Sequence, residues 1–191
     1  IKMSNSQINA SSNLANPAPL GLLGFGMTTI LLNFHNAGFM PLTSVIISMG
    51  IFYGGIAQVI AGILEFKKGN SFGQTAFISY GFFWISLIGI LWLPKAGFEA
   101  TTAPALALYL LLWGIFTFGM FIAALTHNFI TKFIFGSLTI LFVLLALGNY
   151  TANTTLLHIA GYEGIICGLS AVYSALGQLI NESFARKVIP L

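Results

Sequence analysis

The sequence predicts an all-α membrane protein with six transmembrane helices. Of its 191 residues, 57% are hydrophobic and only 6% are charged, and the mean hydropathy is +0.93. Soluble domains carry roughly 25% charged residues, so this chain cannot cover itself with polar surface and requires the bilayer as its solvent. The apolar runs are long and continuous, whereas the strands of a membrane β-barrel would appear as short alternating segments.

Charged residues divide the chain into the expected spans. The stretches without Asp, Glu, Lys or Arg cover residues 3–64, 69–94, 100–131, 133–162 and 164–181. The first stretch can hold two spans of about 20 residues, because a turn-like segment at 35–38 and Pro41 interrupt it. We therefore expect helices at about 18–36, 43–66, 73–93, 103–125, 129–148 and 155–181.

The polar start of the chain and the distribution of basic residues predict the topology. Residues 1–15 are rich in Ser and Asn and are expected to form a disordered cytoplasmic tail, followed by one transmembrane domain at 16–191. With the N-terminus inside, Lys95 is the one basic residue outside, and the others are Lys2, Lys67, Lys68, Lys132, Arg186 and Lys187. The positive-inside rule therefore predicts a multi-pass protein of the cytoplasmic membrane with both termini cytoplasmic.

Small residues recur at intervals of three, four and seven in the second and sixth helices. They are Gly50, Gly54, Ala57, Ala61 and Gly62 in the second helix, and Gly161, Gly164, Gly168, Ala171 and Ala175 in the sixth. These intervals place them on one face of each helix, where they allow close helix packing within or between subunits.

Residue patterns for catalysis and metal binding are absent from the sequence. The chain has no Asp, four Glu, one Cys and three widely spaced His, and it contains no HExxH, GxSxG, Walker A or dinucleotide motif. We therefore expect no metal, no cofactor and no enzymatic activity, because proton transfer and nucleophilic chemistry need matched groups within reach. The basic residues form no run, so nucleic acid is not an expected partner.

The first helix begins with the motif NPAPLGL at 16–22. Asn16 is a suitable N-cap, and prolines fit the first turn. No acidic residue lies there, so the free amides of Leu20, Gly21 and Leu22 could bind an anion at the positive end of the helix dipole, with Gly21 allowing close approach. The alternative is that the motif does no more than start the helix.

Two polar side chains in the second helix are candidates for contact with a solute. Gln58 and Tyr53 must each hydrogen-bond a neighbour or line a path for water, because an unpaired polar group in hydrocarbon is costly. Few such groups occur in the spans, which favours a narrow and weakly polar passage.

Three ionisable residues are candidates for a link to protons. Glu163 lies near the outer end of the sixth helix, either at the interface or in a wet vestibule, and His35 lies at the outer end of the first helix. Glu65 lies at a cytoplasmic helix end beside Lys67 and Lys68, where an ordinary ion pair is expected.

An ordered set of motifs resembles the acetate uptake transporter family, the YaaH-like succinate–acetate permeases. The motifs are NPAPLGL at 16–22, MGIFYGGIAQ at 49–58, AGILE at 61–65, KGN at 68–70, SYGFFW at 79–84, LGN at 147–149 and NE at 181–182. The resemblance implies a six-helix protomer with its own pore, assembled with copies of itself as a hexameric ring in the lipid bilayer. It further implies passage of acetate and succinate, either as proton symport or through a channel.

The resemblance also implies a gate. A Phe, a Tyr and a Leu from the first, third and fifth helices form a hydrophobic constriction in this family, and the local motifs match them to Phe25, Tyr80 and Leu138. A small dry gate would hinder hydrated ions while a compact carboxylate or its neutral acid passes. By the sequence pattern alone these residues would be core packing. The alternatives are a channel for a small neutral solute such as ammonia or water, and a membrane-embedded enzyme.

Overall fold

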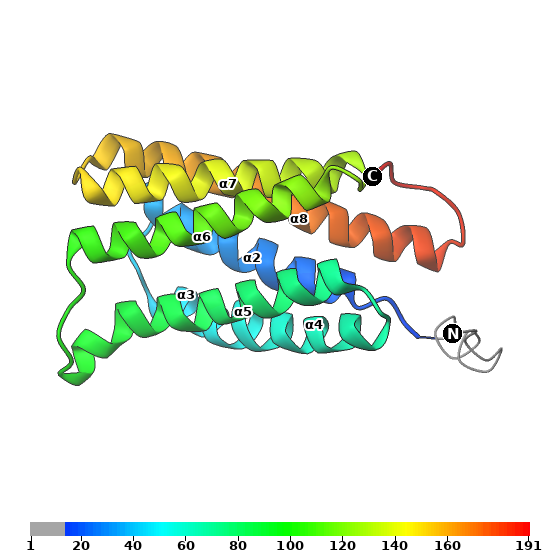
Figure 1. Cartoon of the computed structure of the whole chain (residues 1–191), viewed down its shortest axis with the longest axis horizontal. Helices are drawn as coiled ribbons and strands as arrows, with labels where there is room; N and C mark the ends of the chain where they lie inside the picture. The colour runs from blue at the N-terminus through cyan, green and yellow to red at the C-terminus, as the bar shows by residue number, and fades with distance from the viewer. Residues whose placement is uncertain (1–13) are drawn as a thin grey trace.

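The computed structural model describes residues 14–191, which form a bundle of long helices (Figure 1). Six of them are long and apolar enough to cross a membrane, at residues 18–36, 44–67, 71–96, 103–124, 129–150 and 154–183. No strand occurs within the described residues. The predicted all-α fold with six spans is confirmed, whereas most of the expected disordered tail, residues 1–13, lies outside the described part of the chain.

The first helix, α2 (Ala18–Asn36), has the bounds that the sequence predicts. Pro17, with φ −82° and ψ −12°, occupies the N-cap position, and Pro19 lies in the first turn. The Oδ1 atom of Asn16 accepts a hydrogen bond of 3.3 Å from the amide of Ala18. The prediction that Asn16 is the N-cap was wrong by one position, because Pro17 already has helical dihedral angles and Asn16 caps the helix from outside it.

The second span is not one regular helix. It consists of α3 (Ser44–Ser48), the π-helix η1 (Met49–Ala57) and α4 (Gln58–Lys67). A Cβ added at Gly50 or Gly55 would lie 2.6 Å from the side chain of Ile88 or Ile85 on the next span. Glycine weakens a regular α-helix and also lets the neighbouring helix come close. Both effects are compatible with a π-helix at this place, a rare form that often occurs at functional sites.

The remaining helices have side-chain caps at their first residues. They are α5 (Ser71–Trp92), which continues into the 3-10 helix η2 (Leu93–Ala96), and α6 (Ala103–Ala124), α7 (Phe129–Tyr150) and α8 (Thr154–Ser183). Asn70, Thr102, Asn128 and Asn153 each accept a hydrogen bond from the amide three residues later, which is the N-cap pattern.

The helices pack most extensively in the pairs α2 with α8, α6 with α7, α7 with α8 and α4 with α5. Glycines allow the first pair to come together: a Cβ at Gly26 would lie 2.7 Å from the carbonyl oxygen of Gly168, and a Cβ at Gly168 would lie 2.8 Å from that of Gly26. Such contact between backbones is typical of membrane helices with small residues at the interface.

One end of the bundle carries the start of α2, the end of α8, and the short turns that follow α4 and α6 (Figure 1). The loops after α2, η2 and α7 lie at the opposite end. An even number of spans places the two ends of the chain on the same side. We call this the terminal end of the bundle, and the opposite one the far end.

Candidate functional site

Among the cavities formed by the described residues, three lie one after another along the bundle. An inner cavity of about 360 Å³ lies at the terminal end, where Asn16, Lys68 and Gln178 contribute to its lining. An outer cavity of about 240 Å³ lies toward the far end and includes His35 and Asn149. Between them is a constriction of about 20 Å³, which shares several lining residues with the inner cavity.

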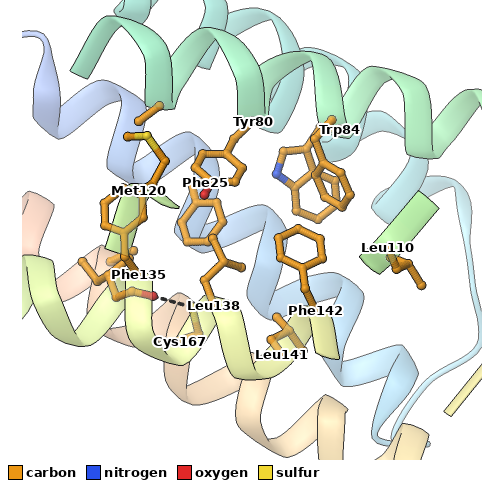
Figure 2. Close-up of a cluster of buried hydrophobic side chains, with 14 of the residues drawn as sticks. Phe25, Tyr80, Trp84, Leu110, Met120, Phe135, Leu138, Leu141, Phe142 and Cys167 are labelled. Carbon is orange, nitrogen blue, oxygen red and sulfur yellow. Dashed lines mark hydrogen bonds between the residues drawn. The ribbon is translucent and has the colours of Figure 1, made fainter. Parts of the chain in front are cut away.

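The constriction is lined by apolar side chains and one amide. Its lining consists of Leu22, Phe25, Gln58, Ala76, Phe77, Tyr80, Ile134, Phe135 and Leu138. Phe25 from α2, Tyr80 from α5 and Leu138 from α7 point toward one another (Figure 2), and the ring centroids of Phe25 and Tyr80 are 6.0 Å apart. The structure therefore brings together the three residues that the resemblance named.

The hydroxyl of Tyr80 is committed to a neighbouring helix. It donates a hydrogen bond of 2.9 Å to Oγ1 of Thr117, which in turn donates one of 2.7 Å to the carbonyl oxygen of Trp113. Tyr80 and Thr117 are both buried. The ring of Tyr80, rather than its hydroxyl, therefore forms the wall of the constriction.

Replacing Tyr80 with phenylalanine is expected to lower the free energy of unfolding by about 1 kcal/mol, because one buried hydrogen bond is lost while Thr117 keeps its bond to Trp113. Thermal unfolding of the purified protein in detergent measures this. The control is Tyr150→Phe, since the side chain of Tyr150 is 66% exposed. Equal melting temperatures for both variants would contradict the assigned bond.

Gln58, the first residue of α4, is the polar side chain of the constriction. Gln58 is 1% exposed, and neither its Nε2 nor its Oε1 has a hydrogen-bond partner within residues 14–191. The indole Nε1 of Trp84 is also buried, has no partner in the described part of the chain, and lies on the side of the ring that faces Tyr80 (Figure 2). Because buried polar groups are almost always paired, this amide has hydrogen-bonding capacity that the described residues do not use.

Comparison with known proteins identifies the family of this chain. The sequence profile of the GPR1/FUN34/yaaH family matches residues 3–191. The chain belongs to this family. The resemblance noted in the sequence is thereby confirmed, and the six apolar helices make this a multi-pass membrane protein.

Three similar proteins carry names that refer to transport or to a channel. The chain is 56% identical over 182 residues to the succinate-acetate/proton symporter SatP of Escherichia coli, covering 95% of this chain and 97% of that protein. The solved structure of the bacterial acetate channel SatP superposes with a TM-score of 0.93 at 57% identity, covering 94% of this chain and 99% of that one. The chain is also 38% identical over 177 residues to ammonia transport outward protein 2 of Saccharomyces cerevisiae, covering 88% of this chain and 62% of that protein.

In this GPR1/FUN34/yaaH protein, the inner cavity contains a network of polar side chains. Nζ of Lys68 donates a hydrogen bond of 3.2 Å to Oδ1 of Asn16, whose Nδ2 donates one of 3.2 Å to Gln178. Glu65 is fully buried, and its Oε2 accepts a hydrogen bond of 2.8 Å from Asn70. The expected ion pair of Glu65 with a neighbouring lysine was wrong, because the turn after α4 directs Asn70 to Glu65 while Lys68 reaches Asn16.

At the start of α2 in this family member, the amide of Gly21 is not free, contrary to the prediction. The amide of Gly21 donates to the carbonyl oxygen of Pro17 at 3.3 Å, and a Cβ at Gly21 would lie 2.5 Å from the ring of Phe77. Gly21 is therefore small because α5 packs against it. Leu20 is 36% exposed, and Leu22 lines both the inner cavity and the constriction.

The remaining candidates are divided between the cavities and the packed helices. His35 lines the outer cavity, with Nδ1 at 3.0 Å from the carbonyl oxygen of Met40, and Glu65 lines the inner one. Glu163 is half-buried and accepts a hydrogen bond from Ser137, but it lines none of the three cavities, because α8 directs it toward α7. The half-buried side chain of Tyr53 lines none of them either, so the structure does not bring these two residues to the path.

Within residues 14–191, no group of three or more His, Cys, Asp or Glu could hold a metal ion.

Two side-chain contacts of the site could not be predicted from the sequence. The links of Lys68 with Asn16 and of Tyr80 with Thr117 join residues 52 and 37 positions apart, and no sequence pattern predicts such pairs. The KGN and NPAPLGL motifs mark two of these residues without indicating that they touch.

Proposed function

We propose that this protein moves acetate, together with other small carboxylates such as succinate, across the cytoplasmic membrane through a pore inside each protomer. The observation that carries the proposal is the succession of an inner cavity with polar lining residues, a narrow and largely apolar constriction, and an outer cavity along one bundle. A constriction with space for about one water molecule disfavours hydrated ions, whereas a compact and partly apolar carboxylate can shed its water more easily. The names of its bacterial relatives support acetate as the substrate.

Exchange of labelled acetate in proteoliposomes tests this function. Protein-free vesicles give the background, because neutral acetic acid crosses lipid by itself. Saturable exchange above that background is expected, and Leu138→Trp, which fills the constriction, is expected to remove it while the oligomer remains intact. Exchange no faster than in protein-free vesicles would overturn the proposal.

A channel for a small neutral solute is the second candidate. The name of the yeast relative and the dry constriction favour ammonia within this class. Excess methylammonium and glycerol would then slow the uptake of labelled solute, whereas formate and succinate would not. For a carboxylate permease we expect the reverse order of inhibition.

The terminal end of the bundle is proposed to face the cytoplasm. Lys67, Lys68, Lys132, Arg186 and Lys187 belong to this end, whereas η2 at the far end carries Lys95. This asymmetry follows the positive-inside rule.

Cysteine labelling is expected to confirm this topology. In a Cys167→Ser background, an impermeant thiol reagent added to intact cells should label Lys95→Cys and leave Lys187→Cys unlabelled until the membrane is opened. Cys167 is fully buried, so its removal changes no labelled surface. Labelling of Lys187→Cys from outside intact cells would contradict the model.

Coupling to protons and assembly as a hexameric ring complete the proposal. His35 and Glu65 are the candidate proton-linked residues, because they line the outer and inner cavities, whereas Glu163 would have to act from outside them. The inner polar network of Asn16, Lys68 and Gln178 provides the first contacts for an anion. The mass of the detergent-solubilised protein by light scattering tests the hexamer.

A further inference from the structure

We propose that the side-chain amide of Gln58 binds the carboxyl group of the permeating molecule inside the constriction. There the amide replaces the water molecules that hydrate this carboxyl group in solution. This inference rests on the proposed function and names the group that recognises the substrate at its narrowest point. It makes Gln58 a specificity-determining residue, distinct from the apolar side chains that set the width.

The amide of Gln58 is buried and has no fixed partner among the described residues. Gln58 is 1% exposed, and both its Nε2 and its Oε1 lack a partner among the described residues. Burying an amide without hydrogen bonds is costly, so a purely structural role would call for a fixed partner. Gln58 lines a cavity, which is where a mobile partner can reach it.

The constriction offers no other free polar side chain to a solute among its lining residues. The remaining lining residues are apolar except Tyr80, whose hydroxyl is used by Thr117. None of them is charged. The space of about 20 Å³ holds about one water molecule, so a carboxyl group that enters must give up most of its hydration.

The amide of Gln58 and a carboxyl group have complementary hydrogen-bonding groups. A carboxamide presents N–H donors and a carbonyl acceptor in one plane. The N–H group can donate to a carboxyl oxygen in either protonation state, and the carbonyl can accept from the O–H of the neutral acid. A carboxyl group can therefore pair with Gln58 in a way that a polyol or an inorganic cation cannot.

Gly24 on α2 leaves room for the side chain of Gln58. Gln58 follows the π-helix η1, and its Cγ would lie 3.2 Å from a Cβ at Gly24 on α2. A larger residue at position 24 would also meet the carbonyl oxygen of Tyr53 at 2.6 Å. The glycine thus leaves the space through which the side chain of Gln58 reaches the constriction.

The test compares Gln58→Leu with the wild-type protein and with Gln74→Leu. Gln74 is a half-buried glutamine of α5 that lines none of the three cavities, so the same substitution there is the control. Exchange of labelled acetate in proteoliposomes should be about tenfold slower in Gln58→Leu, as expected for the loss of one or two hydrogen bonds, and unchanged in Gln74→Leu.

Thermal unfolding separates recognition from a structural role. An apolar side chain of similar size removes two unpaired buried atoms, so Gln58→Leu should melt at the same temperature as the wild type or above it. A lower melting temperature together with slow exchange would assign Gln58 to the fold and overturn the inference.

Competition assigns the protonation state of the bound group. Acetamide offers a donor and an acceptor, whereas methanesulfonate stays ionised and only accepts. Inhibition of the wild type by acetamide alone would show binding of the neutral acid, and inhibition by methanesulfonate alone would show binding of the anion. Either effect should vanish in Gln58→Leu, and its persistence there would overturn the inference.

The outcome also separates this inference from the proposed function. Wild-type exchange with a normal rate in Gln58→Leu would refute the role of the amide and leave acetate transport in place. Absence of exchange by the wild type would overturn both.

Discussion

Replacing Gly168 with valine is expected to prevent α2 and α8 from packing and to abolish recovery of folded protein. A Cβ at this position would lie 2.8 Å from the carbonyl oxygen of Gly26 and 3.0 Å from the amide nitrogen of Ile30. Both are backbone atoms of a helix, so no rotamer change relieves the clash. Because α2 carries Phe25 and Leu22 at the constriction, a displaced α2 would also destroy the site.

Gly119→Val is the matched control for this prediction. A Cβ at Gly119 on α6 meets no atom within 4 Å. The same substitution there should leave the yield, the elution volume and the melting temperature near those of the wild type. Recovery of Gly168→Val with a wild-type elution profile and melting temperature would show that the two helices are further apart than described.

Replacing Leu138 with alanine is expected to widen the constriction and admit larger carboxylates such as lactate. Leu138 is 3% exposed and lines the narrow space with Phe25 and Tyr80. Truncation removes three carbon atoms from the wall where about 20 Å³ is free. It should also lower the free energy of unfolding by about 2–5 kcal/mol, the usual cost of such a change in a core.

Leu141→Ala separates selectivity from stability. Leu141 lies three residues along on α7, is also 3% exposed, and lines none of the three cavities. Both variants should lose similar stability, and only Leu138→Ala should exchange labelled lactate faster than the wild type in proteoliposomes. Equal lactate rates in the two variants would place the gate elsewhere.

The number of spans followed directly from the sequence, because charged residues cannot remain in the hydrocarbon core unpaired and therefore mark its edges. Lys67 and Lys68, for example, end the second span where α4 ends. Side-chain caps such as Asn70 and Asn153 set the starts of α5 and α8. These are local effects, acting within about four residues, so a pattern in the chain reveals them.

The irregular geometry of the second span could not be predicted from the local sequence. A run of apolar residues with glycines reads as a helix, but whether its turns are α or π depends on what packs beside them. Gly50 and Gly55 contact isoleucines of α5, which is known only when the two helices are placed together. This local geometry also precedes Gln58, the residue at the centre of our inference.

The candidate site, too, was determined in part by the sequence and in part by the tertiary structure. The sequence by itself determined a membrane protein of six helices, and its motifs named Phe25, Tyr80 and Leu138 through a family resemblance. Only the tertiary structure decided that these residues meet at a constriction, that Gln58 joins them, and that Glu163 and Tyr53 do not. The physical reason is that a transmembrane helix carries apolar residues on nearly every face. The sequence therefore does not mark which face lines a cavity. That face is set by the contacts between helices that lie far apart in the chain.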